Sequence, residues 1–131
     1  MPPPLRPDPK SWSNDTITAA WIGHATVIIN FFGTVILTDP VFSQRVGINV
    51  PGMFTLGTKR LVVPALSIDE LPPIDLILLS HAHMDHLDPS SLRKFSKNIP
   101  FVIANNTSDL FRSLRLKTVR ELDWGENIEI A

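Results

Sequence analysis

The sequence of 131 residues contains no cysteine. This absence excludes disulfide bonds, thiolate zinc sites and cysteine nucleophiles together. Histidine, aspartate and glutamate are therefore the strong metal ligands that remain available to this chain.

Charge of one sign and long hydrophobic runs are also absent. The 12 basic and 13 acidic residues give a net charge of -1 without any block of like charge, so charge favours neither nucleic acid nor an anionic membrane as a partner. No apolar run approaches the roughly 20 residues of a membrane-spanning helix. The first seven residues lack the apolar core of a secretory signal. These features predict a cytoplasmic protein with no nucleic-acid partner and no membrane segment.

The composition that is present is typical of one globular domain. Hydrophobic residues make up 44% and charged residues 19% of the chain. We interpret residues 1–15, which are rich in proline, as an irregular leader and residues 16–131 as the domain.

The domain begins with segments that predict strands. Residues 17–22, 27–32 and 35–37 are apolar and dense in β-branched side chains. Gly33-Thr34 separates the second from the third, which predicts a hairpin. Residues 40–73 show no sustained period and several prolines and glycines, so we expect a long structured loop without regular elements.

The second part of the chain alternates between strand and helix patterns. The continuous apolar run of residues 74–79 predicts a strand of a mostly parallel sheet that is buried on both faces. Asp88 and Pro89 predict a helix start, with Leu92 and Phe95 facing inward. The remaining predicted elements are a strand at 101–104, a helix capped by Asn106 or Thr107 with an apolar face of Leu110, Phe111 and Leu114, and strands at 119–122 and 128–131. This order predicts an α/β fold with chemistry at the carboxyl end of a strand.

A dense cluster of metal-ligand residues follows the run at 74–79. The segment His81-Ala82-His83-Met84-Asp85-His86 contains three of the four histidines of the chain. His81 and His83 are two residues apart and can bind one metal in an extended turn, whereas Asp85 and His86 can face a second metal about 3.5–4 Å away. The alternative is a polar surface loop that happens to contain histidines. The position beside a buried strand favours the metal site.

This cluster resembles the signature of the metallo-β-lactamase superfamily. Further motifs are similar to its branch of N-acylphosphatidylethanolamine phospholipase D-like proteins, which neighbours the ascorbate-6-phosphate lactonases. These motifs are Trp21-Ile22-Gly23-His24-Ala25-Thr26, Leu37-Thr38-Asp39-Pro40-Val41-Phe42-Ser43, Leu71-Pro72-Pro73-Ile74-Asp75 and Glu121-Leu122-Asp123-Trp124. They occur in order from about Ala20 to Trp124, which is nearly the whole chain.

The resemblance implies a fold and a set of roles. The fold is the N-terminal half of a four-layer αββα sandwich, with a mixed sheet and helices on one face. His81 and His83 would bind the first metal, and Asp85 and His86 the second. Asp39 would lie in the second shell and orient the ligands, and Asp85 would also move a proton as the catalytic residue. Zinc is the expected ion, with manganese or iron as alternatives.

The implied activity is hydrolysis of a small-molecule phosphodiester, lactone or other ester by metal-bound hydroxide. The resemblance also implies that a third histidine for the first metal, a bridging aspartate and a histidine for the second come from the half of the fold that this sequence lacks. No histidine follows His86. The alternative is therefore a non-catalytic half-domain that self-associates, as a homodimer, through the sheet face that the other half would cover.

His24 has two interpretations. At the end of a predicted strand it would line the site near the metals as a second-shell residue, or it would be hydrogen-bonded in a turn. Arg45, Lys59 and Arg60 likewise either meet a phosphate group of a substrate or are solvated loop charges.

Overall fold

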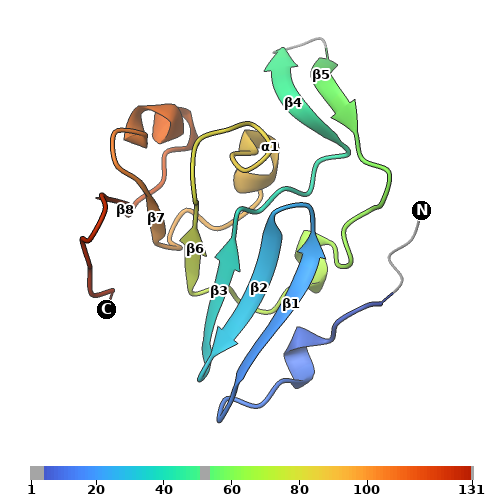
Figure 1. Ribbon diagram of the computed structural model, residues 1–131, viewed down its shortest axis with the longest axis vertical. Coiled ribbons are helices and arrows are strands. Elements are labelled where there is room, and N and C mark those ends of the chain that lie inside the picture. The colour runs from blue at the N-terminus through green and yellow to red at the C-terminus, as the bar shows by residue number, and fades with distance from the viewer. Residues whose placement is uncertain (1–4, 51–53, 131) are drawn as a thin grey trace.

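The computed structural model describes residues 5–50 and 54–130. A six-stranded sheet in the order β1-β2-β3-β6-β7-β8 organises the chain (Figure 1). Its strands are β1 (Ile17–Gly23), β2 (Thr26–Phe31), β3 (Thr34–Thr38), β6 (Leu76–Leu78), β7 (Phe101–Ala104) and β8 (Val119–Leu122). The first three strands pair antiparallel, and β3, β6, β7 and β8 pair parallel. The predicted α/β class with a mixed sheet is confirmed.

The predicted hairpin is the turn between β2 and β3. Phe31 pairs with Thr34, so Phe32 and Gly33 form a two-residue loop. Their φ angles of 50° and 91° are both positive, as a turn that matches the right-handed strand twist requires. Gly33 adopts this conformation without steric cost. The buried Asn30 side chain accepts a hydrogen bond from the Gly33 N–H at 2.8 Å and fixes the turn.

The expectation of an irregular loop over residues 40–73 is wrong in part. The strands β4 (Arg45–Val50) and β5 (Phe54–Lys59) form a separate antiparallel hairpin, which projects from the body in Figure 1. A short 3-10 helix follows at Ile68–Glu70. The glycines in the middle of both strands, Gly47 and Gly57, pair with each other and interrupt the alternation by which strands are recognised.

The helices are shorter than the sequence suggests. The helix α1 (Pro89–Leu92) begins at the predicted N-cap, because Asp88 accepts a hydrogen bond from the Ser90 N–H. The second predicted helix is a 3-10 helix at Ser108–Leu114 after Thr107. Its Phe111 and Leu114 are buried as expected, whereas Leu110 is 52% exposed, because a 3-10 helix has three residues per turn and turns this position outward.

Two further predictions concern the ends of the chain. Residues 128–130 do not form the predicted strand, and residue 131 lies outside the described part. In the leader, residues 1–4 also lie outside it, and Pro9–Ser11 form a 3-10 helix. No helix in the described part of the chain has the length and apolar character to cross a membrane.

The hydrophobic core lies on one face of the six-stranded sheet. Neighbouring strands contribute Ile28, Leu37, Ile77 and Phe101, each fully buried, to one cluster with residues of the helices and connecting loops. The members of this cluster from the helices and connecting loops include Leu66, Leu71, Leu87, Leu92, Phe95, Phe111 and Leu114. The described helices that pack on the sheet therefore cover the same face, as predicted.

The opposite face of the sheet is apolar and open. The strand period of two places Ile36, Leu76 and Leu78 on this face, since their neighbours Leu37 and Ile77 point into the core. Where β1 pairs with β2, the side chains of Ile17, Trp21 and Phe31 are 54%, 65% and 51% exposed. An apolar face of this kind is typical of a surface that another layer covers.

Candidate metal centre

The topology places the candidate ligands at one edge of the sheet. The strands β3 and β6 are adjacent and parallel, so their carboxyl ends lie side by side. Asp39 directly follows β3, and the segment 81–86 follows β6. Open α/β sheets commonly bind ligands at this edge.

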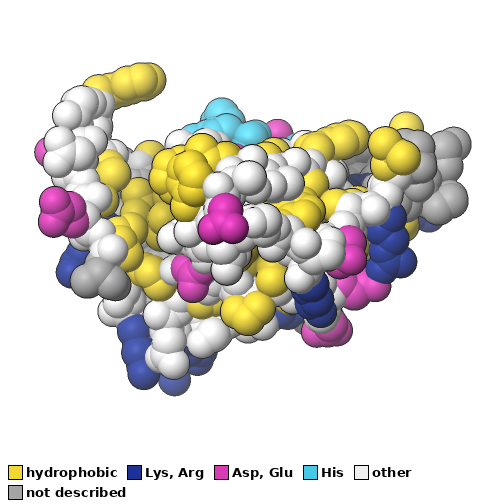
Figure 2. Space-filling view, turned by 90° about the horizontal axis from the view of Figure 1, so that it is seen from below, with side chains coloured by type: hydrophobic (Ala, Val, Ile, Leu, Met, Phe, Trp, Pro, Cys, Tyr) yellow, Lys and Arg dark blue, Asp and Glu magenta, His cyan; other side chains and the backbone are white. Residues whose placement is uncertain are grey.

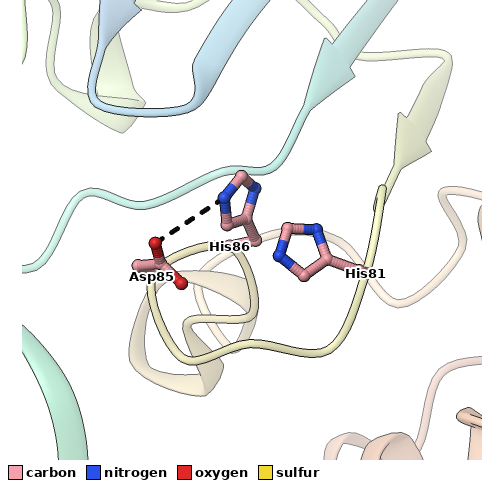
Figure 3. Close-up of side chains that lie close together, drawn as sticks. All are labelled: His81, Asp85 and His86. Carbon is pink, nitrogen blue, oxygen red and sulfur yellow. Dashed lines mark ion pairs between the residues drawn. The ribbon is translucent and has the colours of Figure 1, made fainter.

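Three side chains converge in the loop after β6 (Figure 3). His81, Asp85 and His86 each offer a ligand atom, and these atoms lie within 4.8 Å of one another. The Asp85 carboxylate lies 3.7 Å from His86 Nε2, and the imidazole rings of His81 and His86 have centroids 4.0 Å apart. Two imidazoles and a carboxylate are a donor set that suits a divalent metal. The residues present therefore fit such an ion.

His83 lies beside this triad without belonging to it. Its ring centroid is 4.7 Å from that of His81 in an edge-on arrangement, and its side chain is exposed. Its backbone carbonyl accepts hydrogen bonds from the N–H groups of His86 and Leu87. This turn brings His86 back toward His81. The pairing of His81 with His83 on one metal stays a prediction.

Asp39 contacts one member of the triad, His86. The Asp39 side chain is buried, with 6% exposure. One carboxylate oxygen accepts the Ser80 N–H at 2.8 Å, and the other lies 2.7 Å from Ser80 Oγ and 2.8 Å from His86 Nδ1. The structure therefore places Asp39 in contact with one candidate ligand, His86, and with the residue that precedes another.

Thr26 holds the backbone around Asp39. Its fully buried hydroxyl donates to the Asp39 carbonyl at 2.8 Å and accepts from the Val41 N–H at 3.0 Å. Asp39 has a φ of 38°, a left-handed conformation in which aspartate is enriched. The hydroxyl of Thr26 thus forms hydrogen bonds with the backbone at Asp39 and at Val41.

His24 follows β1 at the same edge of the sheet. Its ring centroid lies 6.2 Å from that of His86, nearly perpendicular to it. Its side chain is exposed, and its carbonyl accepts a hydrogen bond from Trp21 Nε1 at 2.7 Å. His24 thus lies near His86 and has a hydrogen bond in its turn. Its role as a residue that lines the metal site stays a prediction.

A cavity of about 1150 Å³ opens beside the triad. Asp85 and Met84 form one side, and Trp21, Val62 and Val63 contribute apolar surface. Figure 2 shows the histidines at one edge of the molecule with hydrophobic side chains next to them. An apolar cavity with a few polar groups at one end is typical of a small-molecule site.

Arg60 is a partly buried cation in the wall of this cavity. Its guanidinium donates to the Val41 carbonyl at 2.5 Å. Burial lowers the pKa of Arg60, and the charge of Asp88 acts in the opposite direction. A Cβ at Gly23 would lie 3.0 Å from the guanidinium, so Gly23 leaves space for it. Lys59 also lines the cavity. Arg45 donates to the Gly57 carbonyl within the projecting hairpin.

Sequence reasoning assigned no role to Ser80 or Thr26. Ser80 contacts Asp39, His81 and His86 at once. Its position between a buried strand and the first histidine was the available signal. Thr26 ends one of the family motifs, but its contacts could not be predicted from spacing, because they involve Asp39 and Val41, which are 13 and 15 positions away.

Comparison with known proteins agrees with this geometry. A family model described as "Beta-lactamase superfamily domain" matches residues 34–131. The chain is 32% identical to N-acyl-phosphatidylethanolamine-hydrolyzing phospholipase D 1 of Caenorhabditis elegans, over 89% of this chain and 34% of that protein. It is 35% identical to the mitochondrial N-acyl-phosphatidylethanolamine-hydrolyzing phospholipase D of Saccharomyces cerevisiae, over 84% and 23%.

Solved structures show the same fold. A possible metal-dependent hydrolase from Veillonella parvula superimposes with a TM-score of 0.70 at 24% identity, covering 88% of this chain and 45% of that one. An isothiocyanate hydrolase from Delia radicum gut bacteria gives a TM-score of 0.63 at 22% identity, covering 80% and 40%. The chain spans about a third or less of the two curated relatives and under half of these two solved chains. It therefore carries part of the fold, as predicted.

Proposed function

The chain belongs to the beta-lactamase superfamily, and we propose that it carries part of the metal centre of a hydrolase acting on a small-molecule phosphodiester, lactone or other ester. The observation that supports this most is the convergence of His81, Asp85 and His86 within 4.8 Å. Three protein ligands with one open position are the usual arrangement in catalytic zinc sites. Zinc is the proposed ion, and manganese or iron would use the same imidazole and carboxylate donors.

Each residue has a proposed task. His81 and His86 would bind the ion, with His83 as a further ligand after a small movement of its exposed ring. A divalent ion held there would supply Lewis acidity, which stabilises the negative charge that develops on the reacting ester or phosphoryl group. Asp85 would bind the ion and also move a proton; its side chain is 47% exposed and lines the cavity. Asp39 would orient His86 from the second shell, and His24 would line the site.

The cavity supports a substrate with an apolar portion. Trp21, Val62 and Val63 give it an apolar wall, and Lys59 and Arg60 place positive charge within it. The two relatives named above hydrolyse N-acyl-phosphatidylethanolamine according to their names. We propose that the substrate of the whole protein likewise combines an apolar part with an anionic phosphodiester or an ester.

Metal content tests the first part of the proposal. We expect zinc-loaded, size-purified protein to retain about one zinc per chain in elemental analysis. His81→Ala and His86→Ala should lose it, and Asp109→Ala, at an exposed ion pair with Arg112, should not. Wild-type protein without retained zinc would contradict the proposal.

Hydrolysis of bis(p-nitrophenyl) phosphate with added zinc or manganese tests the second part. We expect activity that is lost on His83→Ala and Asp85→Ala. Activity that survives both substitutions would indicate a contaminant. Retained zinc without hydrolysis would favour the alternative, a metal-binding half-domain that is not catalytic by itself.

The open sheet face favours self-association in that alternative. Its apolar side chains, among them Ile17, Trp21 and Phe31, are exposed on one surface. An isologous contact places the same patch on both subunits, and apolar surface matches itself without needing opposite charges. We therefore propose a homodimer through this face, with the test described in the Discussion.

A further inference from the structure

Ser80 occupies a position between three groups of the proposed metal centre. Its hydroxyl lies 2.7 Å from Asp39 Oδ2, 2.9 Å from His81 Nδ1 and 3.3 Å from His86 Nδ1. Its backbone N–H also donates to the other oxygen of Asp39 at 2.8 Å. The Ser80 hydroxyl is thus within hydrogen-bonding distance of both of these histidine rings.

The proton inventory of these groups determines the direction of each hydrogen bond. An ionised carboxylate only accepts, and a hydroxyl has one proton and two acceptor sites. The proton of Ser80 Oγ therefore points to Asp39 Oδ2. The hydroxyl oxygen is then left as an acceptor for His81 Nδ1, which must carry a proton to make the 2.9 Å contact.

The same reasoning applies to His86. Its Nδ1 lies 2.8 Å from the Asp39 carboxylate and therefore also carries the proton. In a neutral imidazole one nitrogen is the donor and the other holds a free lone pair. A neutral ring that donates from Nδ1 keeps its free lone pair on Nε2, and Nε2 of His86 is the atom that faces Asp85 at 3.7 Å.

We propose that Ser80 is a positioning residue that carries the influence of the buried Asp39 carboxylate to His81, so that one carboxylate sets the tautomer of two metal ligands. Asp39 contacts His86 directly and reaches His81 only through the Ser80 hydroxyl. A ligand held in the correct tautomer binds a metal without first moving its proton. The inference rests on the proposed metal-binding function, but the tautomers themselves exist without metal.

The test is the tautomeric state of each histidine in metal-free protein. Side-chain nitrogen chemical shifts from NMR distinguish a protonated Nδ1 from a protonated Nε2. At about pH 8, above the usual titration range of imidazole, we expect His81 and His86 of the wild-type protein to be protonated on Nδ1. A wild-type His81 protonated on Nε2 would overturn the proposal without any variant.

Substitution of Ser80 should change the tautomer of His81 but not that of His86. In Ser80→Ala, His81 should populate both tautomers, because it has lost its acceptor, whereas His86 should stay protonated on Nδ1 through Asp39. Ser80→Thr keeps the hydroxyl and should restore His81. Ser113→Ala removes an exposed serine outside this network and should change neither ring.

Zinc affinity gives a second readout. We expect Ser80→Ala to weaken zinc binding about 10–100-fold, as loss of a second-shell partner does, and Ser80→Thr to recover most of it. Unchanged His81 shifts in Ser80→Ala would overturn the role of Ser80 even if zinc bound normally. Correct tautomers without zinc binding would instead leave the role of Ser80 intact and contradict the proposed function.

Discussion

His86 Nδ1 and Asp39 Oδ2 lie 2.8 Å apart, although the two residues are 47 positions apart in the sequence. The contact forms because Asp39 ends β3 and the loop of His86 follows β6, the strand parallel and next to β3. A buried carboxylate thus contacts a partly exposed imidazole. This relationship connects the sheet core to the proposed metal centre.

Removal of the Asp39 side chain should weaken both metal binding and the fold. Asp39→Ala leaves the Ser80 N–H and the His86 Nδ1–H without their acceptor, which should lower the free energy of unfolding by about 1–3 kcal/mol. Zinc affinity, measured by competition with a chelating dye, should fall about 10–100-fold.

Asp39→Asn is the isosteric variant, and it should also lower the zinc affinity. Asparagine also tolerates the positive φ of this position, so the backbone should keep its conformation. Its amide cannot accept from Ser80 N, Ser80 Oγ and His86 Nδ1 at once. Wild-type zinc affinity in Asp39→Asn would contradict an orienting role for the carboxylate.

Thr26→Val should destabilise the protein although it preserves the shape of the side chain. The buried Asp39 carbonyl and Val41 N–H would both lose the Thr26 hydroxyl, at a cost of about 1–3 kcal/mol in the free energy of unfolding. Thr26→Ser keeps the hydroxyl and should lose less. Denaturant unfolding of the two variants measures the difference, and a larger loss in Thr26→Ser would show that the methyl group matters more.

Glu121 should make the region of the 3-10 helix Ser108–Leu114 sensitive to acid. Hydrogen bonds from Ser108, and then from the Thr107 N–H, lower the pKa of Glu121 below its ordinary value of 4.5. Because the folded-state pKa is the lower one, the ionised carboxylate stabilises the fold above the unfolded-state pKa. This contribution disappears as the pH falls through the folded-state pKa.

The measurement is thermal unfolding from about pH 6 to about pH 3. Glu121→Gln should show a flatter decline of the midpoint than the wild-type protein over this range, and lower stability at its upper end. Hydrogen exchange at the Thr107 and Ser108 amides should also become faster in the variant. Glu129→Gln, at an exposed carboxylate after β8, serves as the control. Identical profiles for wild type and Glu121→Gln would refute the assignment.

Lysine on the open sheet face should prevent self-association. Ile17 and Phe31 pair across β1 and β2 and are both about half exposed. If the face is a homodimer interface, light scattering of the wild-type protein at micromolar concentration should give twice the chain mass of 14.6 kDa. Ile17→Lys and Phe31→Lys should give the single mass, since burying an unpaired charge is costly.

Ser113→Lys adds the same charge to the exposed side of the 3-10 helix and should leave the dimer intact. A wild-type mass of one chain across the concentration range would contradict the proposed interface. A dimer that survives both Ile17→Lys and Phe31→Lys would place the contact elsewhere on the molecule.

The sequence by itself determined the parts of this protein that depend on neighbouring residues. The hairpin at Gly33, the N-cap at Asp88 and a parallel strand within residues 74–79 follow from turn chemistry, capping and local hydrophobicity. This strand is shorter than predicted, Leu76–Leu78, and only Ile77 among its three residues is fully buried, so the expected burial on both faces is wrong. The histidine cluster after that strand, together with the ordered motifs, indicated the superfamily and the edge of the sheet that carries the site.

Only the tertiary structure decided which of these residues meet. The sequence did not predict the hairpin of β4 and β5, because Gly47 and Gly57 interrupt the alternation of side chains along the two strands. The pairing of the two strands is seen only in the structure. The grouping of His81 with Asp85 and His86, and the contacts of Ser80 and Thr26 with the Asp39 region, arise where parallel strands end side by side. The contacts of Thr26 and Ser80 with Asp39 join residues 13 and 41 positions apart, and spacing along the chain does not predict them.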